Sequence, residues 1–199
     1  RSPSRGLGDV YKRQLIIFGL YNTLVKKRNE TDEAKAQIAT QQQRRFDLIP
    51  NLIETVKGYA KHESGVFEQV TALRAEAESI KDDQKALGEN MSAQQAEELM
   101  ARSRDVIGGI NVAVEAYPDL KASQNFSQLQ EELANTENLI SFARQNYNDR
   151  VLEYNNKVQT IPSNIIAGMF GFKTREMFEV ENQEAKVAPK AVSYTHLTL

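Results

Sequence analysis

The clearest pattern in the sequence is a stripe of apolar side chains that recur every three or four residues through the C-terminal half. This spacing predicts a long amphipathic helix of coiled-coil type, with one extra four-residue step at Val151 that makes a stutter. Asn125 with Gln128 forms an N-terminal cap arrangement, and Pro162 ends the helix because its ring cannot continue it. The stripe consists of Phe126, Leu129, Leu133, Thr136, Ile140, Ala143, Tyr147, Val151, Tyr154, Val158 and Ile161.

A second pattern recurs every seven residues farther upstream and passes straight through Pro50. Such a register predicts one long helix, or two nearly collinear helices, with a kink at Pro50. Asp82, Asp83 and Gly88 mark its end, since glycine suits a left-handed C-terminal cap. The positions in this register are Ile38, Arg45, Leu52, Tyr59, Val66, Leu73, Ile80 and Leu87.

A third helix is predicted between these two. Ser92 and Gln95 begin it as a capping box, and Tyr117-Pro118 ends it. Gly108 and Gly109 inside it each cost about 1 kcal/mol relative to alanine. Close packing against a neighbouring helix is the usual reason for such glycines, and a hinge is the alternative. The buried stripe is expected at Leu99, Val106, Ile110, Ala113 and Tyr117.

The chain changes character after Pro162. Residues Ser163–Phe172 are apolar, contain two glycines and have no helical stripe. They predict a loop that folds back over the end of the helices, and the alternative is an exposed apolar loop that touches a membrane or a partner. A short helix at about Arg175–Glu184 and a polar tail are expected to follow.

The two ends of the chain differ from everything between them. Arg1–Gln14 and Val192–Leu199 lack helical periodicity and look like adapter or linker sequence, so we expect them to be foreign to the protein. Disordered native tails are the alternative. Without these segments, the remaining residues carry 21 basic and 26 acidic side chains.

A short apolar run, Leu15–Tyr21, follows the first of these segments. A spanning helix needs about 20 apolar residues, so the run by itself is too short to span, and it is either the end of a truncated membrane helix or an ordinary buried helix end. Lys26, Lys27 and Arg28 then form a positive cluster that favours a cytoplasmic body if the run spans. The predicted organisation is residues 1–14 foreign, 15–25 membrane-helix remnant, 26–161 helical bundle, 162–191 loop, short helix and tail, and 192–199 foreign.

Composition narrows the class of protein. A chain of 199 residues with 40% hydrophobic residues and no Trp suits one domain of elongated helices better than a large α/β enzyme. The absence of Cys removes disulfides, thiolate zinc sites and cysteine nucleophiles. With 25 Lys+Arg against 27 Asp+Glu, the chain lacks the broad basic surface of a nucleic-acid-binding protein.

Side chains suited to catalysis are scarce. A di-iron bundle needs Glu-x-x-His on two helices, whereas His62 has Tyr59 at the required position and His196 lies in a suspected foreign segment. The same shortage argues against a Ser-His-Asp relay, and Gly168–Lys173 lacks the spacing of a phosphate-binding loop. We therefore expect no metal, no cofactor and no enzyme activity.

One charged residue falls on an inward position of the predicted helices. Arg45 shares a register with apolar residues, so it needs a carboxylate partner, because an unpaired buried charge is very costly. Glu115 and Glu137 are candidate partners by residue type, either as a structural pair that sets the register or as part of a ligand site. The candidate inter-helix polar residues are Glu115, Glu137, Asn138, Arg144 and Asn148.

Several strings of the sequence resemble the LemA family of bacterial proteins. The most specific is Asp-Leu-Ile-Pro-Asn-Leu within Arg44–Tyr59, and the resemblance spans about Leu15–Pro189. It implies a short N-terminal membrane helix followed by an antiparallel four-helix bundle, with no established enzyme activity and no catalytic residues to transfer. This chain departs from that pattern by lacking most of the membrane helix. Further matching segments are Tyr21–Val25, Glu115–Lys121, Phe126–Leu133, Glu137-Asn138, Ala143-Arg144, Tyr147-Asn148, Tyr154-Asn155, Pro162–Asn164 and Phe170–Phe172.

The sequence therefore favours an all-α, membrane-anchored scaffold or protein-interaction module of the bacterial cell envelope. Its expected partners are the membrane, which it contacts through a single N-terminal anchor, and unidentified envelope proteins, but no nucleic acid. The sequence does not decide on which side of the membrane the body lies. A small-ligand receptor or enzyme with a polar pocket around Glu115 and Glu137 is one alternative, and a self-associating bundle is another. The candidate interaction surface comprises Arg44, Arg45, Asp47, Pro50, Asn51, Ile165, Phe170 and Phe172.

Overall fold

The computed structural model describes residues 4–59 and 64–178, and within those ranges it contains helices and no strand. The all-α class is therefore confirmed. The long helices are α1 (Ser4–Tyr59), α2 (Ser64–Leu87), α3 (Ala93–Val114) and α5 (Gln124–Gln159). The short elements are the 3-10 turn η1 (Gly88–Asn90), α4 (Pro118–Lys121) and α6 (Ser163–Met169).

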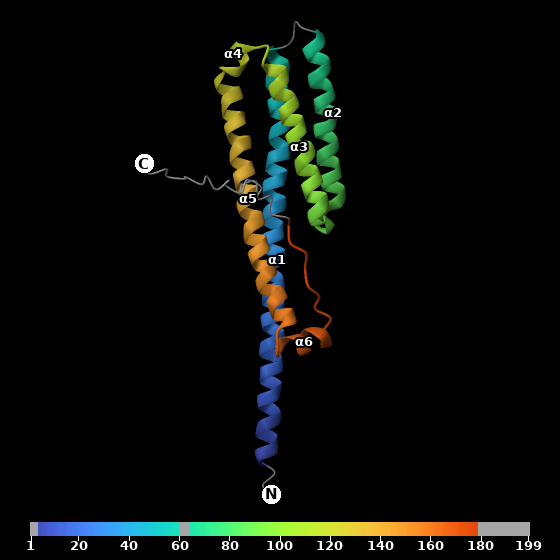
Figure 1. The fold of residues 1–199 in the computed structure, drawn as a ribbon, viewed down its shortest axis with the longest axis vertical. Helices are drawn as coiled ribbons and strands as arrows, with labels where there is room; N and C mark the ends of the chain where they lie inside the picture. The colour runs from blue at the N-terminus through green and yellow to red at the C-terminus, as the bar shows by residue number, and fades with distance from the viewer. Residues whose placement is uncertain (1–3, 60–63, 179–199) are drawn as a thin grey trace, which may run out of the picture.

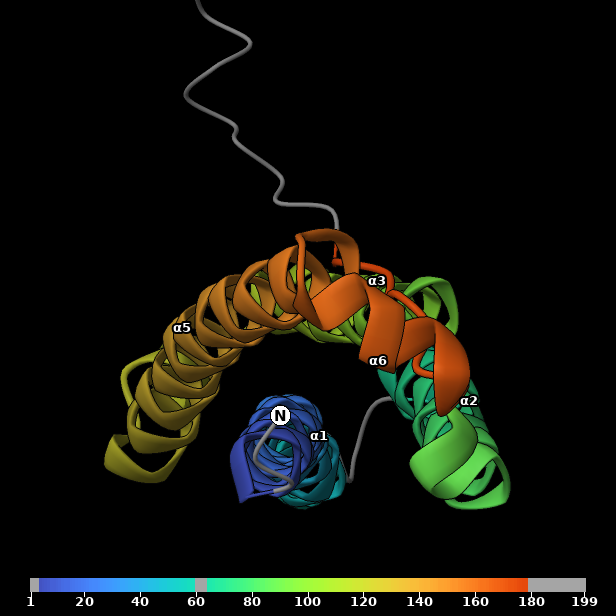
Figure 2. The ribbon, with the colours of Figure 1, turned by 90° about the horizontal axis from the view of Figure 1, so that it is seen from below.

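Helix α1 is the axis of a rod-shaped molecule (Figure 1). Its 56 residues correspond to a length of about 84 Å at 1.5 Å per residue. Helix α5 lies along it, whereas α2 and α3 cover only the part of α1 that is farther from the N-terminus. Seen along the rod, α5, α3 and α2 form an arc around α1 (Figure 2). The N-terminal part of the rod is therefore not covered by α2 and α3.

The chain reverses between α1 and α2, so the predicted single or collinear helix over residues 38–87 is wrong. Ion pairs of 2.6 Å join Arg74 to Glu54 and Lys81 to Asp47, which places α2 antiparallel to α1. Ile38 and Leu52 of α1 and Ile80 of α2 lie in this register and are all buried in the same core. The seven-residue pattern therefore continues through the reversal and does not reveal it.

Capping residues set the helix ends. The predicted capping box of α3 is confirmed, with the Ser92 hydroxyl accepting from the Gln95 N–H and the Gln95 side chain accepting from the Ser92 N–H. Gly88 follows α2 with a φ of 49°, as expected for a left-handed cap. The cap of α5 is Ser123, whose hydroxyl accepts a backbone N–H of the first turn. The predicted cap at Asn125 is wrong, because that residue already lies inside the helix.

Two prolines have the positions that the sequence predicts. Pro50 lies inside α1, although it has no N–H for the helical hydrogen bond. Its neighbours Ile49, Leu52 and Ile53 are at most 1% exposed, so packing in the core holds the helix together at this point. At the other site, α5 ends shortly before Pro162.

The two glycines of α3 have different surroundings. A Cβ atom on Gly109 would lie 2.8 Å from Leu73 Cδ2 of α2, whereas one on Gly108 would meet open space. The close packing that the glycine pair predicts is therefore confirmed at Gly109. At Gly109 the helix α3 packs closely against α2, and a larger residue there would have to displace Leu73.

Two apolar clusters hold the rod together. The larger joins the four long helices and includes Phe46, Leu52, Ile80, Ile110 and Ile140, each at most 1% exposed. The smaller contains Leu24, Ile166 and Ala167 and fastens α6 to α1 near the N-terminal end of the rod. Ser163–Met169 is therefore helical, which corrects the predicted loop, because burying Ile166 and Ala167 on α1 favours a helical turn.

The chain after α6 is extended. Residues 172–178 have no helical structure, so the helix predicted at about Arg175–Glu184 is wrong as far as Phe178. Backbone groups of this segment bond to side chains of α5, which replaces the hydrogen bonds that a helix would supply. The remainder of that predicted helix, and the segment 192–199, lie outside the described residues.

The N-terminal part of α1 extends beyond the other helices (Figure 1). The helix is continuous from Ser4 through the apolar run Leu15–Tyr21. Leu15, Ile16 and Phe18 are 70%, 59% and 54% exposed, so the alternative of a buried helix end does not hold for them. In the described parts of the chain, we find no helix with a stretch long and apolar enough to cross a membrane.

Candidate functional site

Arg45 is buried at the middle of the rod, with 4% of its surface exposed. Its Nε–H donates to Ser103 Oγ and its Nη1–H to the Leu133 carbonyl oxygen, both at 3.2 Å. Nη1 also lies 2.6 Å from Glu137 Oε2. Burial lowers the pKa of Arg45 from its ordinary value, and the Glu137 carboxylate opposes that change. One side chain thereby joins α1 to both α3 and α5.

Glu137 extends this contact into a series of alternating charges. Its Oε1 lies 3.2 Å from Arg104 Nη1, Arg104 Nη2 lies 2.8 Å from Glu97 Oε1, and Glu97 Oε2 lies 2.5 Å from Arg144 Nη1. Each carboxylate is thus held between two guanidinium groups, and the series ends in a positive charge. We name these five residues, Arg45, Glu137, Arg104, Glu97 and Arg144, the ion-pair ladder.

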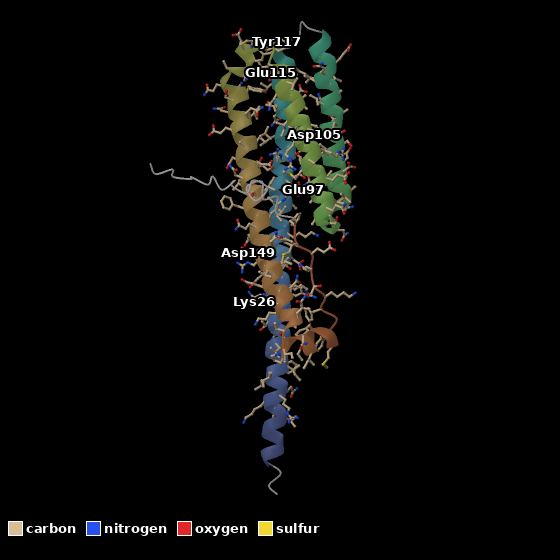
Figure 3. All side chains as sticks on the ribbon, in the orientation of Figure 1. Lys26, Glu97, Asp105, Glu115, Tyr117 and Asp149 are labelled. Atoms are coloured by element: carbon tan, nitrogen blue, oxygen red, sulfur yellow. The ribbon has the colours of Figure 1, made fainter. Side chains whose placement is uncertain are left out.

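Glu115 does not join Glu137, so the predicted pocket around these two carboxylates does not form in the part of the chain that the structure describes. Asn111 bonds to Gln130 at 2.8 Å while Arg104 faces Glu137, so α3 and α5 are antiparallel. On that register Glu115 lies near the start of α5, about 16 Å along the helix from Glu137. Its side chain is exposed near the α4 end of α3 (Figure 3).

An extended segment, Lys173–Phe178, lies along α5, and we name it the strap (Figure 1). Asn155 Nδ2 donates to the Arg175 carbonyl oxygen and its Oδ1 accepts the Arg175 N–H, both at 2.9 Å. Asn148 makes the same two bonds to Phe178, at 2.9 and 2.8 Å. A side-chain amide has a donor and an acceptor side by side. Each asparagine therefore makes the bonds that a neighbouring antiparallel β-strand would make.

Two tyrosines add a second pair of bonds to the strap. The hydroxyl of Tyr154 donates to the Lys173 carbonyl at 2.9 Å and that of Tyr147 to the Glu176 carbonyl at 3.1 Å. Burial raises the pKa of both phenols, so they remain protonated donors at neutral pH. A step of seven residues along α5 covers about 10.5 Å, and three residues of extended strap cover about 10 Å. The matched lengths allow a repeated Tyr-Asn pair to hold a strand.

The strap also contacts α1 and the ion-pair ladder. Arg175 lies 2.6 Å from Asp32 and bonds to the Thr31 hydroxyl. The rings of Phe178 and Tyr147 meet edge to face at 5.2 Å, and the guanidinium of Arg144 lies over the Phe178 ring at 5.4 Å. The strap therefore ties α1 to α5 and ends against the last arginine of the ladder.

The sequence gives only part of this site in advance. Asn148 is among the predicted inter-helix polar residues, but it binds the strap, and Asn138 is exposed on α5. Asn155 and the two tyrosines are not among the predicted site residues. The signal that could have found them is the Tyr-Asn dipeptide, which recurs after seven residues at 147 and 154.

A model of the LemA family matches residues 34–193, which include the ion-pair ladder and the strap. The chain belongs to the LemA family. A LemA protein of Metamycoplasma hominis is 25% identical over 169 residues, which is 85% of this chain and 73% of that protein. The magnetosome proteins MamQ 1 and MamQ 2 of Paramagnetospirillum magneticum are each 24% identical over 175 residues, which is 80% of this chain and 64% of theirs. The chain thus spans just under two thirds of these magnetosome relatives.

The predicted interaction surface of this LemA-family chain divides into two places. Arg44 and Asn51 are exposed on α1 and Pro50 is half-buried. The Asp47 carboxylate is held by Lys81 of α2 at 2.6 Å, and Arg45 points inward to the ladder. The other three residues, Ile165, Phe170 and Phe172, belong to the α6 end of the rod. That end packs on α1 at Leu24, about 30 Å along the helix from Arg44.

Aromatic contacts fix the α6 end of this LemA-family protein. The ring of Tyr21 in α1 lies 4.8 Å from that of Phe170 and 5.8 Å from that of Phe172, centroid to centroid. The guanidinium of Arg28 lies over the Phe172 ring at 5.3 Å. Phe172 is therefore half-buried, whereas Phe170 remains 54% exposed.

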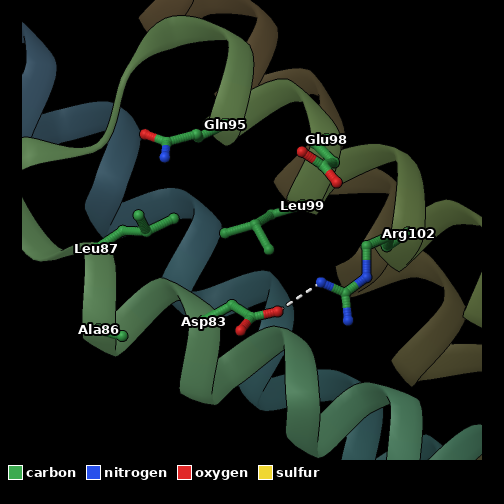
Figure 4. A pocket seen from close by; sticks show the side chains of 7 residues that line it. All are labelled: Asp83, Ala86, Leu87, Gln95, Glu98, Leu99 and Arg102. Atoms are coloured by element: carbon green, nitrogen blue, oxygen red, sulfur yellow. Dashed lines mark hydrogen bonds and ion pairs between the residues drawn. The ribbon is translucent and has the colours of Figure 1, made fainter.

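Two hollows lie beside α2. A small one of about 240 Å³ lies between α2 and α3, where Asp83 pairs with Arg102 at 2.6 Å (Figure 4). A groove of about 760 Å³ lies between α1 and the tip of the α2–α3 hairpin, lined in part by Gln42, Gln84 and Phe178. Gln84 Oε1 is buried without a hydrogen-bond partner. Within residues 4–59 and 64–178, no three or more His, Cys, Asp or Glu side chains are grouped to hold a metal ion.

Proposed function

We propose that this chain is a membrane-anchored helical scaffold of the bacterial cell envelope, whose four long helices act as one antiparallel bundle. The observation that carries the proposal is the apolar run of α1. Leu15 and Phe18 are 70% and 54% exposed where α1 extends beyond the other helices. Neighbouring exposed apolar side chains mark contact with lipid or with another protein. The LemA resemblance, which implies an N-terminal membrane helix, supports lipid as that contact.

Such a scaffold presents a rigid protein surface to its partners and requires no bond-making chemistry. Helix α1 continues from the apolar run to Tyr59 at the far end of the rod, which is about 57 Å beyond Tyr21 at 1.5 Å per residue. An anchor at one end would hold α4 and the adjoining ends of α2 and α3 at about that distance from the bilayer. Because the ladder ties α1 to α3 and α5, the displayed surfaces would keep a fixed arrangement for envelope proteins.

Vesicle flotation tests the anchor. We expect the chain to float with vesicles of bacterial polar lipids, and Leu15→Asn with Phe18→Asn to weaken binding about a hundredfold, because each exposed apolar side chain contributes about 1.5 kcal/mol when buried. The matched control is Val112→Asn with Phe142→Asn, two apolar residues that are 68% and 72% exposed on α3 and α5. Flotation that is equally weakened by both pairs, or absent in the unaltered chain, would contradict the anchor.

A small-ligand receptor is a second candidate function, favoured by the groove of about 760 Å³ beside Gln84. The unpartnered Oε1 of Gln84 is a buried acceptor that would suit a ligand with a hydroxyl or amide donor. A thermal-shift screen of polyols and primary amides tests it, since a ligand at 100 times its Kd adds about 2.7 kcal/mol of stability. We expect Gln84→Ala to abolish any shift and the exposed Gln94→Ala to keep it. A shift that survives Gln84→Ala would place the ligand elsewhere.

A further inference from the structure

The helix α6 has apolar side chains on two opposite faces. Its inner residues Ile166 and Ala167 are 5% and 1% exposed against α1. Its outer residues Ile165 and Met169 are 59% and 70% exposed, and Phe170 after its end is 54% exposed. A surface helix in water normally places polar residues on its outer face. The composition of α6 therefore suits a position between protein on one side and an apolar phase on the other.

The exposure of this outer face is fixed by packing. Leu24 of α1 is fully buried under α6, and Tyr21 contacts the rings of both Phe170 and Phe172. These contacts hold the short helix against α1 and leave Ile165 and Met169 facing outward. The structure thus builds an exposed apolar patch, which we name the α6 patch and define as Ile161, Ile165, Met169 and Phe170.

Positive charge surrounds the α6 patch. Residues 15–29 of α1 and residues 154–175 contain no acidic residue, although the whole chain has 27 Asp+Glu. Lys26 lies close to this end of the rod (Figure 3), and the guanidinium of Arg28 lies directly over Phe172. The basic residues in the two segments are Lys26, Lys27, Arg28, Lys157, Lys173 and Arg175. This combination of exposed apolar and basic side chains is the one that binds anionic lipid surfaces.

We propose that the α6 patch inserts into the interfacial layer of an anionic lipid bilayer beside the apolar run of α1. The inference rests on the proposed anchor and adds a second contact that would fix the angle between rod and membrane. Tyr21, which α6 contacts, is only three residues from Phe18, or about 4.5 Å along α1. The α6 patch and the C-terminal end of the apolar run therefore lie at nearly the same level along the rod, and so would lie at nearly the same depth in a bilayer.

A second copy of the chain fits this surface less well than lipid. In a two-fold dimer the same patch meets itself, so Lys26, Arg28, Lys157 and Lys173 of both copies would be brought together, whereas Lys27 and Arg175 pair with acidic residues of their own chain. Like charges directly opposed across an interface oppose association. Lipid phosphates supply the opposite charge and the acyl chains supply the apolar contact.

The absence of Trp in the chain allows a direct test with a single introduced reporter. Met169→Trp places it in the α6 patch, and Phe142→Trp is the matched control, because these residues are 70% and 72% exposed. The vesicles contain one part phosphatidylglycerol to three parts phosphatidylcholine. We expect the emission of the Trp at 169 to shift to shorter wavelength and to be quenched by lipids brominated high on the acyl chain, with no change at 142. On vesicles of pure phosphatidylcholine we expect the binding to be at least about tenfold weaker.

A third variant, Phe18→Trp, separates failure of this inference from failure of the anchor. If the reporter at 18 responds to vesicles and the one at 169 does not, the α6 contact is overturned and the anchor stands. If neither responds, both proposals fail. A shift at 169 without vesicles that grows with protein concentration would assign the patch to a second copy and overturn the lipid contact. Equal binding to both kinds of vesicle would overturn its anionic character.

Discussion

Replacing Arg45 by alanine is expected to lower the free energy of unfolding by about 2–4 kcal/mol, because it removes two hydrogen bonds and an ion pair of a buried cation. The guanidinium is 4% exposed and serves three groups at once, namely Ser103 Oγ, the Leu133 carbonyl and the Glu137 carboxylate. Its loss would also leave Glu137 with Arg104 as its remaining cation. The variant therefore weakens contacts of α1 with both α3 and α5.

Urea unfolding followed by circular dichroism measures this effect, with Arg44→Ala as the control. Arg44 has the same side chain one position earlier in α1, but it is exposed, so its removal is expected to change stability by no more than about 0.5 kcal/mol. If the two variants unfold at the same urea concentration, Arg45 has no structural role of the kind that its burial indicates. A ligand role would then gain support, because the ladder would not be needed for folding.

Replacing both Asn148 and Asn155 by alanine is expected to release the strap while the helices remain folded. The double variant removes four hydrogen bonds of 2.8 to 2.9 Å between α5 side chains and the strap backbone. At about 1 kcal/mol for each bond, the loss of about 4 kcal/mol corresponds to a decrease in local protection of several hundredfold. The tyrosine hydroxyls, the contacts of Arg175 with Asp32 and Thr31, and the packing of the Phe178 ring would remain.

Hydrogen exchange at the Arg175 and Phe178 amides is the appropriate measurement, since these N–H groups donate to the two asparagines. Asn156→Ala is the control, because Asn156 is adjacent to Asn155 but exposed. Unchanged exchange at both amides in the double variant would mean that ring packing and the Arg175–Asp32 pair hold the strap. Loss of helicity as well as of protection would mean that the strap is part of the main core.

How far the sequence predicts this structure depends on how local each interaction is. The periodicity of α3 and α5 is sufficient because a stripe every three or four residues reports one buried helical face. The reversal between α1 and α2 is missed because both helices contribute to one core at the same seven-residue spacing. Pattern alone therefore predicts the helices of this rod well and their connections poorly.

The polar site depends on contacts between distant parts of the chain. The register of Arg45 predicts that it requires a carboxylate, but only the packing of α1 against α3 and α5 selects Glu137 and leaves Glu115 exposed. Residues 172–178 have no local tendency that marks them as extended, since α5 supplies their hydrogen bonds from about 20 to 30 positions earlier. A helix is a natural expectation for such a segment when those partners are unknown.

The length of α1 has a mechanical consequence for a rod that is tethered at one end. A load applied to the far end of α5 would pull α5 lengthwise past α1, with which it shares contacts at widely separated levels, including Lys27 with Glu153 and Arg45 with Glu137. In this shear geometry, the contacts along the interface carry force together and do not open one after another. The antiparallel pairing of the first and last long helices thus makes the molecule stiffest along the direction in which a tether would strain it.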